Sequence, residues 1–266
     1  MQYTVIESTE LNVSRLAFGT ASLHHVFSNR KRINILGAAL DSGITHFDTS
    51  PYYGYGLAES DLGKIMSGRR NEVTIATKVG LYPMGWYARC SFDVWTRKAA
   101  GKLFDQISLP RVNWEVKQAD SSLNASLKRL KTDYVDILYL HEPNQHLIKS
   151  DEFISWLERV RSDGKIRYWG LAGAPNLFED WICTSNPLAQ ILQVYDSLDD
   201  KEADIILQYG RGLQFTYGYL NALSLNPVKR SAVTVLKHAL KRNKNGSILF
   251  STRRTERIKS LVDNLM

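Results

Sequence analysis

The chain has 266 residues, of which 44% are hydrophobic and 23% are charged, a profile typical of a soluble globular protein with a sizeable core. No apolar run approaches the roughly 18 residues of a membrane span, and the N-terminus lacks the basic start and apolar segment of a signal peptide. We therefore expect a cytoplasmic protein with no membrane contact. Cys90 and Cys183 suit a reducing compartment, and a single disulfide between them is the less favoured alternative.

The net charge is +7, and the basic excess gathers between residues 229 and 259. Nucleic-acid binding is one interpretation of such a cluster. No recognised nucleic-acid motif accompanies it, so a solvated helix surface with an anion site is favoured, and we expect no nucleic-acid partner.

Short apolar runs that end in a polar residue or glycine recur along the chain and predict eight strands. Continuous runs such as residues 135–140 are typical of strands buried on both faces of a parallel sheet. The predicted strands are Leu16–Gly19, Thr45–Asp48, Thr74–Lys78, Val135–His141, Tyr168–Ala172, Ile191–Tyr195, Ile205–Tyr209 and Ser247–Phe250.

Amphipathic segments between these runs predict helices. In the first of them Gly43 takes the position of a C-cap, and Asp151 is a candidate N-cap of the fourth. The predicted helices are Asn29–Ser42, Leu57–Met66, Glu115–Leu130, Asp151–Asp163, Val228–Arg242 and Thr255–Leu265.

This alternation predicts a single α/β domain over residues 1–266, a (β/α)₈ TIM barrel. A doubly wound sheet is the alternative, but no GxGxxG follows the first strand. Residues 81–114, with a short helix predicted at Thr96–Ile107, form a long loop after the third strand and are expected on the catalytic face. Only Asp199–Ala203 is available between the sixth and seventh strands, which predicts a truncated or missing helix there.

Four residues with complementary proton chemistry occur at or just after predicted strand ends. Asp48, Lys78 and His141 end three strands, and Tyr53 lies in the loop after the second. Barrel enzymes carry their active residues at this rim. We expect Lys78, held by Asp48, to lower the pKa of Tyr53 from about 10, so that Tyr53 acts as a general acid. His141 would donate a ring N–H to a substrate carbonyl.

Taken singly, each of these residues is more often structural: a turn tyrosine, a lysine with an extended stem, a capping aspartate, a strand-ending histidine. Their occurrence together at strand ends favours the catalytic interpretation. The set suits carbonyl reduction, in which a developing alkoxide must receive a proton.

The chain resembles the aldo-keto reductase family over nearly its whole length. The blocks that carry the resemblance are DTSPYYGYGLAES from Asp48, ATKVG around Lys78 and LKRLKTDYVDILYLHEP ending after His141, with SDGKIRYWGLAG and ILQVYD further on. The resemblance implies a (β/α)₈ barrel whose bottom is closed by an N-terminal β-hairpin within Met1–Ser14. It also implies an NADPH cofactor, with NADH as the alternative, and reversible reduction of a small-molecule aldehyde or ketone.

The resemblance also implies cofactor contacts. Gln193 matches a glutamine that binds the nicotinamide carboxamide, Tyr209 is the candidate stacking aromatic, and the loop after it is the candidate pyrophosphate loop. The basic residues near the last helix favour a 2′-phosphate and hence NADPH. The full set of cofactor candidates is Gly19, Thr20, Asp48, Ala172, Gly173, Gln193, Tyr209, Gly210, Arg211, Gly212, Ser251, Thr252, Arg253 and Arg257.

The chain departs from the family pattern after the fifth strand, where Ala172-Gly173 replaces the usual Ser-Asn pair that grips the carboxamide. Gln193 would then act more alone, or Asn176 would replace the pair. The chain stops at Met266, after the last helix, whereas many relatives continue into a loop that builds the substrate pocket.

Other loops must then supply the substrate-binding residues, so we expect these to be Tyr55, Trp86 and His141, with Tyr87 and Trp95 as further aromatic candidates. An aromatic wall suits a sugar ring or a flat carbonyl compound. We expect no metal.

The sequence therefore predicts an NAD(P)H-dependent oxidoreductase that reduces an aldehyde or ketone, sugars included. One alternative is a nucleotide-binding accessory or regulatory barrel with little turnover. A barrel isomerase or aldolase that uses Lys78 as a Schiff base is a third. Substrate identity, physiological direction and oligomeric state do not follow from the sequence.

Overall fold

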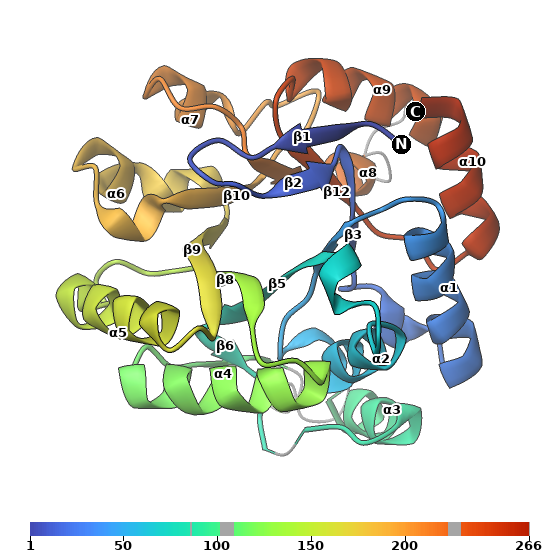
Figure 1. Cartoon of the computed structure of the whole chain (residues 1–266), viewed down its shortest axis with the longest axis horizontal. Coiled ribbons are helices and arrows are strands. Elements are labelled where there is room, and N and C mark those ends of the chain that lie inside the picture. Colours follow the sequence, from blue (N-terminus) through green and yellow to red (C-terminus); the bar gives the residue numbers. More distant parts are fainter. Residues whose placement is uncertain (86, 102–108, 223–229, 266) are drawn as a thin grey trace.

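The computed structural model describes residues 1–85, 87–101, 109–222 and 230–265. Eight parallel strands close into a barrel, as predicted, and each strand pairs with two neighbours (Figure 1). In chain order the strands are β3 (Leu16–Gly19), β4 (His46–Asp48), β5 (Thr74–Val79), β8 (Val135–His141), β9 (Ile166–Gly173), β10 (Ile191–Tyr195), β11 (Phe215–Tyr217) and β12 (Ser247–Phe250).

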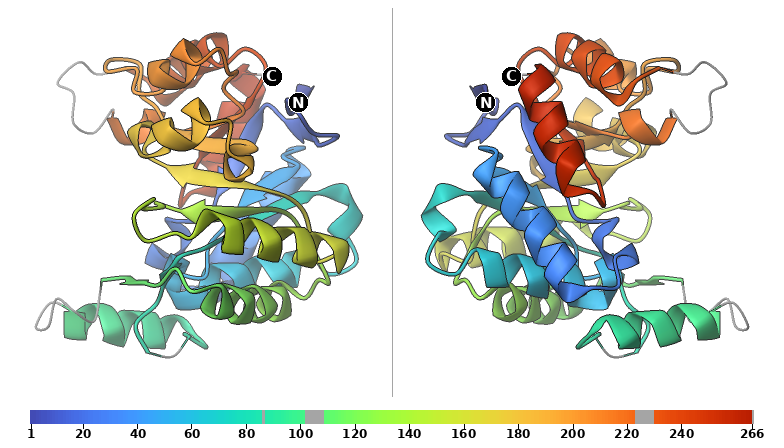
Figure 2. Two further views of the ribbon diagram at one scale, coloured as in Figure 1. Left: turned by 90° about the vertical axis from the view of Figure 1, so that its left-hand side faces the viewer. Right: turned by 90° about the vertical axis from the view of Figure 1, so that its right-hand side faces the viewer.

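Helices surround the barrel and cover its outer face (Figures 1 and 2). The longer ones are α1 (Asn29–Asp41), α2 (Leu57–Ile65), α4 (Val116–Leu130), α5 (Ser150–Ser162), α9 (Ala232–Arg242) and α10 (Thr255–Leu265). Three short ones are α6 (Glu179–Cys183), α7 (Asp204–Gln208) and α8 (Tyr219–Ala222). Their apolar sides pack on strands whose outward residues are equally buried, so the main core lies between helices and barrel.

Most helix ends match the sequence patterns, with two corrections. Gly43 has φ 84° and follows the C-cap of α1, where glycine adopts the left-handed region without strain. Asp151 is not an N-cap: Lys149 holds that position, and Asp151 lies in the first turn of α5. Helix α9 begins at Ala232, where the Ser231 hydroxyl caps it, instead of at Val228, and residues 228 and 229 lie outside the described residues.

The seventh strand is β11, and the prediction of a strand at Ile205–Tyr209 is wrong. That apolar run forms α7 instead, so the short helix between the sixth and seventh strands lies there and not at Asp199–Ala203. A run of three apolar residues does not distinguish a strand from a helix, and the acidic Asp204 favours a helix start. The Phe-Thr-Tyr sequence of β11 has the aromatic and β-branched residues that favour strands.

A hairpin of β1 (Tyr3–Val5) and β2 (Asn12–Ser14) closes the end of the barrel at which the strands begin. Ile6, Leu11 and Val13 are fully buried there and share one apolar cluster with inward residues of the barrel such as Ala17 and Phe215. This end is therefore filled with side chains, which leaves the opposite end, where the strands finish, available for a site.

Residues 81–114 form an insertion after β5. Strand β6 (Leu81–Tyr82) pairs antiparallel with β7 (Arg111–Val112), and α3 (Ser91–Gly101) projects from the barrel between them (Figure 2). Helix α3 begins five residues before the predicted Thr96, and residues 102–108 lie outside the described residues. The buried Arg32 guanidinium donates to the Ser91 hydroxyl at 2.6 Å and ties the insertion to α1.

Within the described residues, no helix combines the length and apolarity needed to cross a bilayer. Cys90 and Cys183 are both exposed free thiols, so the alternative of a disulfide is not met.

Candidate active site

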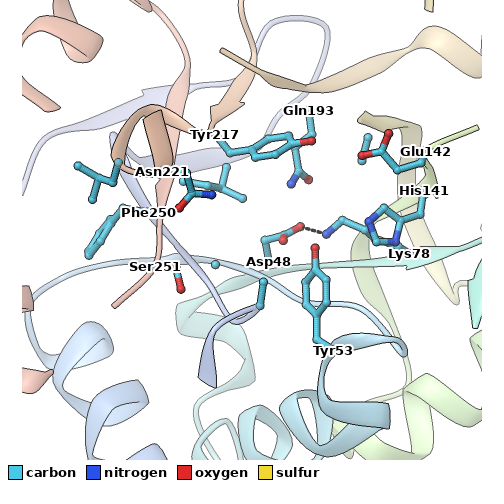
Figure 3. Close-up of a pocket in the computed structure, with 16 residues that line it drawn as sticks. Asp48, Tyr53, Lys78, His141, Glu142, Gln193, Tyr217, Asn221, Phe250 and Ser251 are labelled. Carbon is cyan, nitrogen blue, oxygen red and sulfur yellow. Dashed lines mark hydrogen bonds and ion pairs between the residues drawn. The ribbon is translucent and has the colours of Figure 1, made fainter. Parts of the chain in front are cut away.

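A cavity of about 260 Å³ opens where the strands end, and every strand of the barrel contributes to its wall (Figure 3). Strand ends converge here because parallel strands all finish at the same rim. The strand residues that line it are Gly19, Asp48, Lys78, His141, Ala172, Gln193, Tyr217, Leu249 and Phe250, and Tyr53 joins them from the loop after β4. The four predicted catalytic residues therefore share one cavity.

Asp48 and Lys78 form a buried ion pair at the floor of the cavity. Lys78 is 2% exposed, and its Nζ donates to the Asp48 carboxylate and, at 3.0 Å, to the Thr49 carbonyl oxygen. Burial lowers the pKa of Lys78 and raises the pKa of Asp48, and the attraction between the two charges opposes both shifts. The pair places the Lys78 ammonium, with the Asp48 carboxylate beside it, close to the Tyr53 ring.

The Tyr53 ring lies near both this pair and His141. The Lys78 Nζ lies 5.2 Å from the centroid of the Tyr53 ring, and the His141 ring meets that ring edge-on at 5.9 Å. The turn that carries Tyr53 requires left-handed backbone at Gly54, with φ 59°, and a Cβ there would lie 2.6 Å from the His24 Cβ. Glycine is therefore needed next to Tyr53 for steric reasons.

The pKa of Tyr53 shifts in the direction opposite to the prediction. Burial raises it well above its ordinary value, and the negative charge of Asp48 adds to the shift, with smaller contributions from Tyr217 and Glu142. The ammonium of Lys78 is already paired with Asp48, which offsets its effect on the phenol. Tyr53 therefore keeps its proton at neutral pH, which is the form that a general acid needs.

His141 is neutral. It is 9% exposed, and burial, together with the charge of Lys78, lowers its pKa well below the ordinary value. Its Nδ1 is buried and has no hydrogen-bond partner among the described residues. A neutral imidazole carries one N–H and can donate it into the cavity without adding charge.

Several predicted cofactor residues do reach the cavity. Gly19, Ala172, Gln193 and Ser251 line it, and Gly173 ends β9 beside Ala172. The other predicted cofactor residues follow these in the sequence. Thr20 is fully buried, and its N–H donates to the Asp48 carbonyl at 2.9 Å. Thr252 is buried next to Ser251, and Arg253 and Arg257 are exposed near the start of α10.

The predicted aromatic and pyrophosphate loop lies at the wrong end of the barrel. Arg211 donates to the Ala189 carbonyl and, at 3.0 Å, to the Gln190 carbonyl, both of which precede β10. A Cβ on Gly212 would lie 2.5 Å from the Glu7 carboxylate of the N-terminal hairpin. Tyr209 is 41% exposed in a groove on the same side, next to Gly210. The error follows from the misplaced seventh strand.

Tyr217 takes the position that the sequence reasoning assigned to Tyr209. It ends β11, its ring faces the cavity next to Gln193, and its register partner is Tyr195 (Figure 3). The glycine that follows Phe-Thr-Tyr was the signal for a strand end. Two further polar cavity residues also escaped the sequence reasoning: Glu142, directly after His141, and Asn221 on α8.

The expected aromatic substrate wall is not seen among the described residues. Tyr55 is 6% exposed and packs with Leu57, Ala88 and Val94 beneath the insertion instead of lining the cavity. Trp95 is 59% exposed on α3.

Tyr87 and Trp86 are the remaining aromatic candidates for the substrate wall. The Tyr87 ring is covered by the Arg129 guanidinium at 3.9 Å. Trp86 lies outside the described residues, and His141 alone of the expected substrate residues is placed in the cavity. The described part of the chain contains no group of three or more His, Cys, Asp or Glu that could hold a metal ion.

Comparisons with known proteins agree with this fold. The model of the Aldo/keto reductase family matches residues 15–181, and the chain belongs to that family.

The chain is 30% identical over 229 residues to the aldo-keto reductase YhdN of Bacillus subtilis, covering 83% of this chain and 62% of that protein. It is 29% identical over 217 residues to the L-galactose dehydrogenase of Arabidopsis thaliana, covering 79% of this chain and 56% of that protein. The matched regions thus span only about three-fifths of these curated relatives.

Among solved structures, the holo form of aldo-keto reductase AKR11C1 from Bacillus halodurans superposes with a TM-score of 0.76 at 22% identity, covering 99% of this chain and 90% of that one. The glycerol dehydrogenase AKR11B4 from Gluconobacter oxydans has a TM-score of 0.74 at 18% identity, with 99% and 90% covered. These two likenesses concern the fold.

Proposed function

We propose that this chain is an NAD(P)H-dependent reductase that converts an aldehyde or ketone, sugars included, into an alcohol, with Tyr53 as the general acid. The observation that carries the proposal is the convergence of Tyr53, His141 and the Asp48–Lys78 pair on one cavity. A site built only to bind a nucleotide has no use for a protonated phenol beside a buried ammonium.

The residues around the cavity fit a nicotinamide. Gln193 has a buried Oε1 without a hydrogen-bond partner among the described residues, so an acceptor is available for a carboxamide N–H. Tyr217 offers a ring face, and Gly19, two strands away in the barrel, leaves its part of the wall without a side chain. When bound, a reduced nicotinamide supplies the hydride that carbonyl reduction requires.

The chain's own residues handle the carbonyl oxygen and the proton. The Tyr53 hydroxyl and the His141 N–H donate hydrogen bonds to that oxygen, which orients and polarises the carbonyl. As negative charge develops on the oxygen, Tyr53 transfers its proton to it, so the alcohol leaves neutral. Lys78, held in place by Asp48, stabilises the phenolate until solvent returns a proton.

Replacement of Tyr53 by Phe tests this role. We expect kcat to fall by a factor of about 10²–10⁴, the range for a general acid, while the Kd for NADPH, measured by fluorescence titration, stays within about two-fold. Tyr52→Phe, one residue away, is the matched control and should turn over normally. An unchanged kcat in Tyr53→Phe would refute the assignment. Saturable NADPH binding by the wild type, without turnover of any aldehyde, ketone or sugar, would favour an accessory protein instead.

The preference for NADPH is part of the proposal. Arg253 and Arg257 are exposed near the start of α10, where a helix N-terminus and two guanidinium groups suit a phosphate. Replacing both by Ala should weaken NADPH binding and leave NADH binding unchanged. An equal effect on both cofactors would assign these arginines to general surface charge.

A further inference from the structure

Glu142 is a second carboxylate in the catalytic cavity, and the mechanism above leaves it without a role. It follows His141 directly, with a left-handed φ of 48°, a backbone conformation that is unfavourable for a non-glycine residue. Its N–H donates to the Ala172 carbonyl at 2.7 Å, and its side chain lines the cavity on the side of β8 and β9 (Figure 3). The unusual backbone thus places the carboxylate at the site.

Gly173 provides the space that this carboxylate occupies. A Cβ at position 173 would lie 2.7 Å from the Glu142 Oε2 and 3.0 Å from its Cδ. A side chain at 173 and the present position of Glu142 therefore exclude each other. Neither Ala172 nor Gly173 has a polar side chain, so Glu142 brings the polar group that the end of β9 lacks.

The Glu142 carboxylate has polar neighbours and keeps acceptor capacity toward the cavity. Burial raises the pKa of its carboxyl, and the neighbouring Ala174 backbone and Tyr217 hydroxyl oppose that shift. A carboxylate has about four acceptor sites, so these two neighbours cannot saturate it. Nearby, the Gln193 side chain acts to lower the pKa of the Asp48 carboxyl, and its Oε1 has no partner among the described residues.

This wall of the cavity therefore presents two acceptors, the Glu142 carboxylate and the Gln193 Oε1. A primary amide nitrogen offers two N–H groups, and a buried acceptor without a donor is unfavourable. We propose that Glu142 is a cofactor-binding residue whose carboxylate accepts an N–H of the nicotinamide carboxamide, in place of side chains from the end of β9. The inference rests on the proposed use of a nicotinamide cofactor.

The test compares two cofactors that differ at the carboxamide. NADPH and its reduced 3-acetylpyridine analogue, which carries a methyl group in place of the amide nitrogen, are titrated against wild type, Glu142→Ala and Glu142→Gln. A hydrogen bond to a charged group corresponds to about ten-fold in Kd. We expect the wild type to prefer NADPH and Glu142→Ala to lose about ten-fold of that preference. Glu142→Gln should retain part of it, because its amide oxygen still accepts.

The control is Tyr217→Phe, which removes the hydroxyl beside Glu142 and keeps both the carboxylate and the aromatic ring. It should preserve the preference for NADPH over the analogue, which separates the carboxylate from a structural effect through Tyr217. An unchanged preference in both Glu142 variants, each verified as folded by circular dichroism, would overturn the inference. So would an unchanged preference combined with a raised KM for a polyhydroxylated aldehyde, since Glu142 would then bind substrate. Failure of the wild type to bind NADPH would refute the proposed function itself.

Discussion

Replacement of Asp48 by Asn keeps the shape of the side chain and removes the charge that balances Lys78. In the wild type, Lys78 donates to Asp48 and to the Thr49 carbonyl, and its side chain is 2% exposed. The variant leaves a buried ammonium whose acceptors, the Thr49 carbonyl and the introduced amide oxygen, are both neutral. Removing one partner of a buried ion pair typically costs about 3–5 kcal/mol.

The cost has an upper limit because Lys78 can release its proton. From a reference pKa of about 10.4, neutralising a lysine costs about 4.6 kcal/mol at pH 7 and about 1.9 kcal/mol at pH 9. Burial already lowers the pKa of Lys78, and loss of Asp48 lowers it further. The folded variant then binds fewer protons than the unfolded chain, so its stability relative to wild type rises with pH.

The assay is urea unfolding of wild type and variants at pH 7 and pH 9. Asp48→Asn should lose about 3–5 kcal/mol at pH 7 and less than about 2 kcal/mol at pH 9. The control is Asp41→Asn, whose carboxylate pairs with Arg69 on the surface and is 72% exposed, and which should cost under about 1 kcal/mol at both pH values. Adding Lys78→Met to Asp48→Asn should recover stability at pH 7.

Two results would refute this reasoning. The first is a loss in Asp48→Asn that does not change between pH 7 and pH 9. The second is a double variant as unstable as Asp48→Asn alone, because the cost would then not come from the uncompensated charge of Lys78.

Three further outcomes are expected. Tyr217→Ala should weaken NADPH binding about five-fold through loss of an aromatic contact, while Tyr209→Ala should leave it unchanged; equal effects in a fluorescence titration would contradict the placement of β11. Burial lowers the pKa of His46, whose ring stacks on Phe215, to about 3. Below about pH 6.5 the unfolded chain binds a proton that the folded chain does not, so in acid unfolding the wild type should lose up to about 1.4 kcal/mol of stability per pH unit relative to His46→Phe. Parallel stability profiles of the two proteins would argue against this. Glu142→Gln should weaken binding of NADP⁺, whose nicotinamide ring is cationic, more than binding of NADPH in calorimetric titrations, because the carboxylate favours the charged ring. An equal loss would indicate that the charge has no part.

Local patterns in the sequence were sufficient for the barrel. Strand and helix periodicities depend on residues close in the chain, and seven of the eight predicted strands lie where the structure has them. The exception shows the limit of such patterns, because the run at 205–209 is apolar enough for either a strand or a helix. Which segment forms the seventh strand depends on pairing with β10. That partner is β11, where Phe215 lies opposite Gln193 and Tyr217 opposite Tyr195.

The sequence by itself also located the proposed catalytic residues, because Asp48, Lys78 and His141 end strands and all parallel strands end at one rim. Only the tertiary structure decided their protonation and their neighbours. The pKa of Tyr53 rises because the fold buries the phenol, and Glu142 enters the cavity because Gly173, on the adjacent strand, leaves it room. Burial and contacts between strands depend on residues that are distant in the chain, so no local sequence pattern predicts them.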